Sequence, residues 1–139
     1  MSLSVYINFK QPTRHNYFLS HPYTYDGLSD ADKANYDIDE YWEANITHNC
    51  GEMASHVPLG DISLYEVCWR PEEVFKEPTT NDLVPLLTAG ITYMLANRKQ
   101  LSQYNPKNGW GSYDALMKFL LNYKQACEDY PDCKIEVSR

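Results

Sequence analysis

The sequence predicts a single α+β domain, mostly helical, with four or five helices and a small sheet. Strand patterns stand near both ends of the chain, at residues 4–10 and 133–138, and helical patterns fill the middle. Terminal strands with helices between them often pair, so we expect these two to share the sheet. With 139 residues, 43% of them hydrophobic, the chain can build one core. No linker, repeat or low-complexity tract divides residues 1–139 into further domains.

The first 40 residues begin with a strand and continue without a clear period. Residues 4–10 alternate and are rich in β-formers, and Pro12 ends this strand. Residues 11–28 carry prolines, histidines and tyrosines in irregular order, which is typical of a long functional or covering loop. Ser29 followed by acidic residues predicts the start of a helix, because serine caps a helix and acids suit its first turn.

A central helix is predicted over residues 43–57, and Pro58 ends it. At helical spacing, one face of this stretch would carry polar side chains: Asn45, His48, Asn49, Glu52 and His56. The other face would carry an apolar stripe: Trp42, Ile46, Cys50, Met53 and Val57. One side would then face the core while the other presents amides, imidazoles and a carboxylate.

The remaining helices are predicted from their capping signals. Ser63 and Glu66 form a capping-box pattern, which predicts a short helix over residues 62–69, and Pro71 starts another. Residues 80–82 cap a longer helix that should end near Tyr104. After a tight loop, Ser112 caps the last helix, which ends at Pro131.

Composition excludes several classes of protein. The net charge of −7, with scattered basic residues, disfavours binding of nucleic acid. No signal peptide or membrane-length apolar run is present, so we expect no membrane association and a cytoplasmic location. The four cysteines have no C-x-x-C spacing and are predicted to be reduced thiols. No nucleotide-binding glycine motif appears either, so the sequence indicates no particular cofactor and leaves open whether there is one.

His48 and Glu52 are the candidate catalytic residues. Their i, i+4 spacing suits two ligands of one metal ion, as does the spacing of Glu52 and His56. A third ligand would have to come from elsewhere, for instance His15, His21 or Asp61. The alternative is structural: His48 is a hydrogen-bonded histidine, with Asn45 and Asn49 bonded to the backbone of a neighbouring loop.

Trp69, Arg70 and Trp110 are further candidates for a recognition surface, because Trp and Arg are enriched in binding hot spots. Equally, Trp69 could fill the core and Arg70 could close a helix end. Trp110 lies between Gly109 and Gly111, whose freedom of φ allows an unusual loop.

Four stretches together resemble a family of small bacterial and phage-type proteins of unknown function. They are Asn45-Ile-Thr-His48-Asn49, Leu64-Tyr65-Glu66…Trp69-Arg70-Pro71-Glu72-Glu73, Asn105-Pro106…Asn108-Gly109-Trp110-Gly111-Ser112-Tyr113 and Ile135-Glu136-Val137-Ser138-Arg139. The resemblance covers about residues 36–139. It implies a cytosolic, prophage-related setting, but no activity, cofactor or functional residue.

We therefore expect a cytosolic, non-enzymatic binding or accessory protein whose partner is an unidentified protein or small ligand. The first alternative is a metal-dependent, hydrolase-like enzyme that uses His48 and Glu52, with Asn45 and Asn49 orienting the substrate. The second is a small-ligand binder that uses the same residues, with a pocket between the central helix and residues 11–28.

Overall fold

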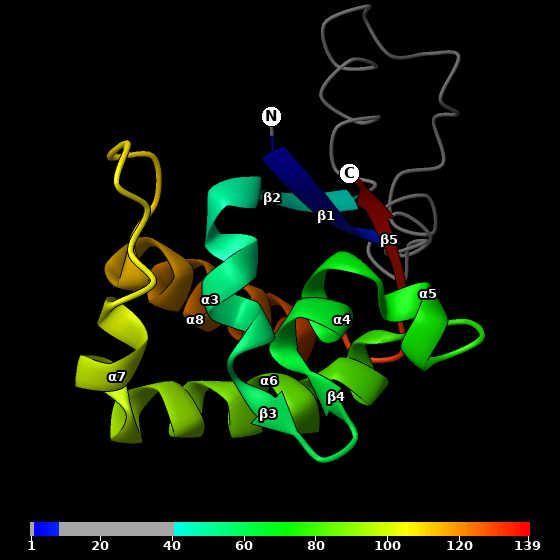
Figure 1. The fold of residues 1–139 in the computed structure, drawn as a ribbon. Coiled ribbons are helices and arrows are strands. Elements are labelled where there is room, and N and C mark those ends of the chain that lie inside the picture. Colours follow the sequence, from blue (N-terminus) through cyan, green and yellow to red (C-terminus); the bar gives the residue numbers. More distant parts are fainter. Residues whose placement is uncertain (1, 9–40) are drawn as a thin grey trace, which may run out of the picture.

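The computed structural model describes residues 2–8 and 41–139 (Figure 1). The predicted loop at residues 11–28, with His15 and His21, lies outside the described residues, as does the helix start at Ser29. The fold class is confirmed: six α-helices and a small antiparallel sheet make up the described part of the chain.

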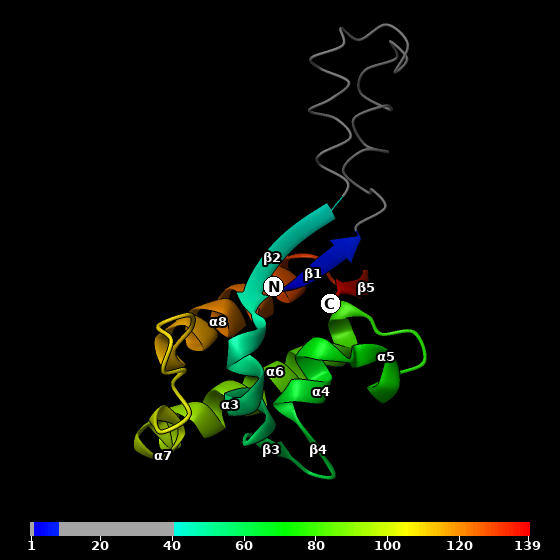
Figure 2. The same ribbon diagram turned by 45° about the horizontal axis from the view of Figure 1, so that its top comes forward.

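The sheet joins the two ends of the chain, as predicted. Strand β1 (Ser2–Asn8) lies between β2 (Tyr41–Thr47) and β5 (Lys134–Ser138), and both pairings are antiparallel. Val5, for example, stands opposite Ala44 on one side and Val137 on the other. Every second residue of β1 is buried against the helices, namely Leu3, Val5 and Ile7. The described helices lie to one side of the sheet (Figure 1, Figure 2).

The predicted central helix over residues 43–57 is wrong in its first half. The chain forms β2 up to Thr47, then a 3-10 turn η2 (His48–Cys50) and a short helix α3 (Gly51–Ser55). Pairing with β1 along the whole of β2 outweighs the helical spacing. Period-two alternation was also present in β2, since Trp42, Ala44 and Ile46 are less exposed than the residues between them.

The next segment contains a small hairpin before two short helices. Strands β3 (Pro58–Leu59) and β4 (Ile62–Ser63) pair around Gly60, which has a φ of 71°. The predicted capping box is confirmed: Ser63 and Glu66 cap α4 (Leu64–Trp69). Helix α5 (Pro71–Val74) starts at the proline, as expected.

Two long helices, α6 (Thr80–Ala96) and α8 (Tyr113–Asp129), pack against each other below the sheet. The single helix predicted to reach Tyr104 is wrong, because the chain breaks at Asn97 and continues as α7 (Arg98–Ser102). The side-chain amide of Asn97 donates to the Tyr93 carbonyl oxygen at 2.9 Å, which ends the helix locally. Ser112 caps α8, as predicted.

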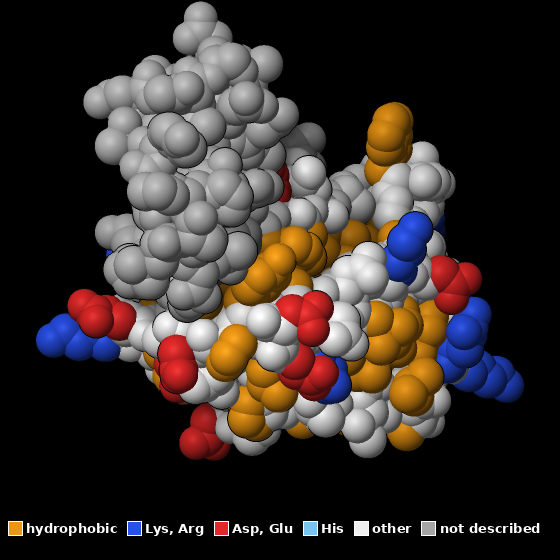
Figure 3. Space-filling model, turned by 180° about the vertical axis from the view of Figure 1, so that it is seen from behind, with side chains coloured by type: hydrophobic (Ala, Val, Ile, Leu, Met, Phe, Trp, Pro, Cys, Tyr) orange, Lys and Arg blue, Asp and Glu red, His pale blue; other side chains and the backbone are white. Residues whose placement is uncertain are grey.

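One hydrophobic core lies between the sheet and the helices. Its largest fully buried side chains come from β1, α3, α4, α6, α7 and α8, and include Trp69, Tyr123 and Leu116. Seen from behind, some hydrophobic side chains reach the surface among charged ones (Figure 3). Leu95 and Leu121 are the most exposed leucines among the described residues. Within residues 2–8 and 41–139, no helix combines the length and apolar character needed to cross a membrane.

Candidate functional site

An open groove lies where β2 ends, between η2 and the loop that precedes α8. It has a volume of about 560 Å³. Its lining comes from three parts of the chain: Ser2, Asn45, Ile46, Thr47, His48, Asn49 and Trp110. Four of the predicted site residues therefore meet here, namely Asn45, His48, Asn49 and Trp110. They meet through a strand end and a distant loop, and not along one helix.

His48 is fixed in the groove by a buried tryptophan. The indole Nε1–H of Trp69 donates to Nδ1 of His48 at 2.9 Å. Trp69 is only 2% exposed and stacks on Tyr65, with ring centroids 5.4 Å apart. An indole N–H can only donate, so Nδ1 must accept, and the neutral imidazole carries its proton on Nε2. His48 therefore offers the groove a hydrogen-bond donor at Nε2.

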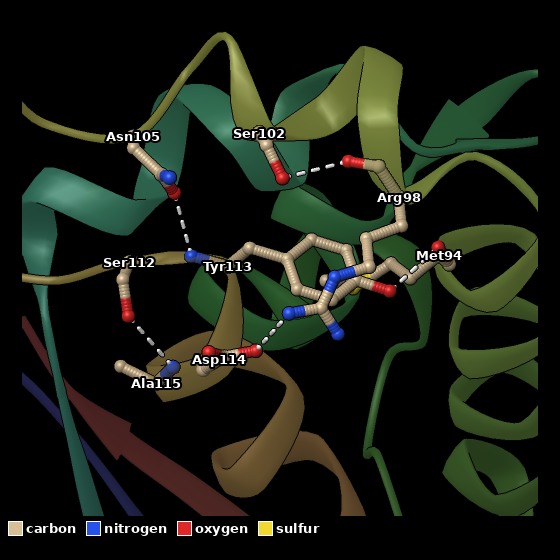
Figure 4. A network of polar contacts seen from close by, with 8 residues as sticks. All are labelled: Met94, Arg98, Ser102, Asn105, Ser112, Tyr113, Asp114 and Ala115. Carbon is tan, nitrogen blue, oxygen red and sulfur yellow. Dashed lines mark hydrogen bonds and ion pairs between the residues drawn. The ribbon is translucent and has the colours of Figure 1, made fainter.

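The loop that carries Trp110 is braced at several points along its length. The side chain of Asn105 accepts from the Tyr113 backbone N–H at 2.7 Å, and Ser112 Oγ accepts from Ala115 N–H at 3.0 Å (Figure 4). Asn108 Oδ1 accepts from the backbone N–H of Trp110 at 2.9 Å. Side-chain oxygens that bond nearby backbone N–H groups are typical of ordered turns and helix starts.

Tyr113 anchors the end of the same loop in the core. Its hydroxyl donates to the Met94 carbonyl oxygen at 2.6 Å, and burial raises the pKa of this phenol. The guanidinium of Arg98 lies 4.8 Å from the centre of the Tyr113 ring and pairs with Asp114 at 3.0 Å (Figure 4). The loop is thus tied to both α6 and α7.

Gly111 brings the loop into contact with the end of β2. Its φ is +100°, and a Cβ at this position would lie 2.7 Å from Thr47 Cγ2 and 2.8 Å from Cys50 Sγ. Only glycine combines this backbone angle with so close an approach. The contact places the neighbouring residue, Trp110, beside the end of β2.

Several polar groups of the groove have no partner among the described residues. Asn45 Oδ1 accepts from the Ser4 hydroxyl at 2.6 Å, which leaves the amide N–H₂ of Asn45 free. The side-chain amide of Asn49 and the Nε2–H of His48 make no hydrogen bond within residues 2–8 and 41–139. Trp110 is 71% exposed, so one large aromatic surface stands beside these groups.

Four predicted site residues lie outside the groove lining: Trp69, which supports His48 from the core, and Glu52, His56 and Arg70. Glu52 is exposed on α3, and its backbone carbonyl oxygen accepts from His56 Nδ1 at 2.8 Å. The ring of His56 stacks on Tyr104, with centroids 4.0 Å apart. Arg70 pairs with Glu73 at 3.6 Å on the surface. Within the described part of the chain, no three His, Cys, Asp or Glu side chains are grouped closely enough to hold a metal ion.

The cysteines are unsuited to nucleophilic chemistry. All four are free thiols, and burial raises the pKa of Cys50, Cys68 and Cys133. Burial raises the pKa of Cys127 to about 12. A thiol needs a lowered pKa to react as a thiolate at neutral pH, so none of these is an activated nucleophile.

The four stretches that carry the family resemblance come together around the groove. Asn45–Asn49 and the Trp110 loop line it, and Trp69 supports it from below. Arg139 lies behind Trp69, where its guanidinium donates to the Trp69 carbonyl oxygen at 2.7 Å and pairs with Glu72. This convergence was missed from the sequence, because no spacing rule links positions so far apart in the chain.

Comparisons with protein-family models, curated proteins and solved structures found no match for this chain. The resemblance to small bacterial and phage-type proteins therefore stays a prediction.

Proposed function

We propose that this chain is a non-enzymatic binding protein of the cytoplasm and that its binding site is the groove between the end of β2 and Trp110. The observation that carries the proposal is the exposure of Trp110, at 71%, on a loop braced by side-chain hydrogen bonds. A large aromatic side chain that is exposed on an ordered loop is typical of a binding surface.

The state of His48 favours binding over catalysis. If Nε2 were to act as a base or a metal ligand in the neutral ring, the proton would have to move to Nδ1. The Nδ1–H would then face the Trp69 N–H, which can only donate, and the hydrogen bond between the two side chains would be lost. Glu52, the second residue of the enzyme hypothesis, does not line the groove.

The charge of the molecule narrows the choice of partner. With a net charge of −7 and an uncharged groove lining among the described residues, the site offers no electrostatic attraction to a nucleic acid. A small molecule or a short peptide is the better candidate.

The proposal can be tested by NMR with tryptophan labelled with ¹⁵N, because the chain has only three tryptophans. A panel of small molecules would be titrated: neutral sugars, nucleosides, amino acids, dipeptides and organic acids. The signal of Trp110, assigned with a Trp110→Phe variant, should shift with at least one class. Asn49→Ala should weaken that response, whereas Asn122→Ala, an exposed asparagine on α8, should not.

Two results would contradict the proposal. One is a Trp110 signal that stays unchanged with every class in the panel. The other is turnover of a generic ester or phosphate substrate that is lost in a His48→Gln variant, since that would restore the enzyme hypothesis.

A further inference from the structure

We infer that the ligand of the groove is an uncharged saccharide. This inference rests on the proposed function, and it adds the chemical class of the ligand. It follows from three properties of the lining: its charge, its hydrogen-bonding groups and the aromatic surface beside them.

The lining excludes ligands that depend on charge. Among the described residues, seven line the groove, and they include no Lys, Arg, Asp or Glu. A carboxylate or phosphate that enters would lose water without gaining an opposite charge, and the net charge of −7 would repel it further. An amine would equally lack a carboxylate partner. A neutral ligand neither gives up the hydration of a charged group nor is repelled by the net charge of the protein.

The free polar groups match hydroxyl groups. The Asn49 amide both donates and accepts, the Asn45 amide N–H₂ donates, and His48 donates from Nε2. A hydroxyl group likewise donates one hydrogen bond and accepts others, so a ligand rich in hydroxyls can satisfy all three side chains at once. Trp69 fixes the His48 ring in the donating form, which prepares the site before the ligand arrives.

Trp110 supplies the apolar part of the site. A pyranose ring presents C–H groups on its faces and hydroxyls around its rim. The face of an indole carries partial negative charge, which attracts such polarised C–H groups. The exposed Trp110 and the amides beside it therefore offer one surface for the ring face and one set of partners for the rim.

The size and position of the groove agree with this class of ligand. Its volume of about 560 Å³ lies within the range of small-molecule sites, about 300–1,000 Å³. The groove lies where β2 passes into η2, and the side chains of Asn45, His48 and Asn49 supply its polar groups.

The experiment compares neutral sugars with charged counterparts of the same ring. Glucose, galactose, N-acetylglucosamine, maltose and lactose would be titrated into the ¹⁵N-tryptophan protein, followed by glucuronate and glucose 6-phosphate. At least one neutral sugar should shift the Trp110 signal to saturation. Its charged counterpart should bind about tenfold more weakly or not at all, because the charge finds no partner.

Variants show whether the groove is responsible. Because Trp110→Ala removes the reporting signal, isothermal titration calorimetry measures its affinity for the sugar, which should fall about tenfold or more, as expected for an exposed aromatic at the centre of a site. Asn49→Ala should weaken it about two- to tenfold, the range for one neutral hydrogen bond. Two controls, Leu95→Ala and Asn122→Ala, change a similarly exposed residue on α6 and on α8 and should leave affinity unchanged.

The outcomes separate this inference from the proposed function. If a dipeptide, nucleoside or organic acid shifts Trp110 and no sugar does, the saccharide inference is overturned while the binding function stands. If charged and neutral sugars bind equally, the argument from charge is overturned. If nothing in the wider panel moves Trp110, both proposals fall.

Discussion

Trp69, which supports His48, and Trp110, which lines the groove, have opposite environments. Trp69 is 2% exposed, stacks on Tyr65 and donates its indole N–H to His48. Trp110 is 71% exposed, and its side chain makes no hydrogen bond within the described part of the chain. Its backbone, in contrast, is held by Asn108, and the loop around it by Asn105 and Ser112.

From this difference we infer that Trp69 supports the site and that Trp110 recognises the ligand. Trp69 contributes to folding and fixes the tautomer of His48, whereas Trp110 contributes little to folding and presents its ring to solvent. Side-chain hydrogen bonds hold the backbone of this exposed loop in place although Trp110 is not buried. We infer that the position of the Trp110 ring is important for recognition and not for the core. Each of the following substitutions should affect one side of this comparison more than the other.

The largest effect is expected for Trp69→Ala. Removal of this buried indole leaves a cavity in the core and leaves His48 Nδ1 without its donor. The free energy of unfolding should fall by about 3–5 kcal/mol. Urea denaturation followed by circular dichroism measures it. A loss below about 1 kcal/mol would contradict the buried position of Trp69.

Gly111→Ala should be the next largest, with Gly109→Ala as its matched control. Both glycines have positive φ, but a Cβ at Gly109 meets no atom within 4 Å, whereas one at Gly111 meets Thr47 and Cys50. We expect a loss of about 2–3 kcal/mol for Gly111→Ala, from strain and overlap together. Gly109→Ala should cost about 1 kcal/mol, from strain alone. Equal losses in urea denaturation would show that the loop does not press on β2.

Glu66→Gln should change how stability depends on pH. The Ser63 hydroxyl donates to Glu66 and lowers the pKa of that carboxyl, and the Ser63 backbone N–H donates to it at 2.8 Å. The folded pKa thus lies below the unfolded one. The contribution of Glu66 is complete above the unfolded pKa and is lost as pH falls through the folded pKa.

The variant should therefore lose about 1 kcal/mol at neutral pH and nothing below the folded pKa, because glutamine accepts the same bonds without charge. Unfolding measured from pH 7 down to pH 3 gives the difference between the two proteins. A gap that stays constant over this range would disprove the role of the charge. Helix α4, which carries Trp69, starts at this capping box. The substitution should therefore weaken the region around Trp69 and leave the loop around Trp110 unchanged.

The smallest effect on stability is expected for Trp110→Ala. Because the side chain is mostly exposed, the free energy of unfolding should change by no more than about 0.5 kcal/mol. The same variant should bind a neutral sugar about tenfold more weakly or worse. A clear loss of stability would mean that Trp110 is a structural residue, and the comparison with Trp69 would no longer hold.

Much of the fold could be predicted because its signals are local. The capping residues Ser63 and Ser112 each place a helix start correctly, and Pro71 starts α5. The break at Asn97 was missed, since an asparagine that bonds the Tyr93 carbonyl oxygen can also sit within a helix. The strand β2 was missed because its apolar residues fit both helical and strand spacing.

For the candidate site, the sequence predicted several of the residues but not how they are arranged. Asn45, His48, Asn49 and Trp110 were all identified from their chemical types, and all four line the groove. The reason given for Asn45, His48 and Asn49, a shared helix face, was wrong for Asn45, which lies in β2. Glu52 and Arg70 were chosen on the same kind of evidence, but the fold places both outside the groove lining.

The sequence by itself determined the fold class, the starts of several helices, the pairing of the terminal strands and the acidic charge. The fold class, the helix starts and the charge depend on composition and on neighbours within a few residues, where propensity and capping act. The strand pairing follows from the rule that terminal strands with helices between them often pair. Only the tertiary structure decided that Trp69 supports His48, that Gly111 presses on Thr47, and that Trp110 stands in solvent beside free amides. Such contacts join residues far apart in the chain, and only packing of the whole core fixes which of them meet.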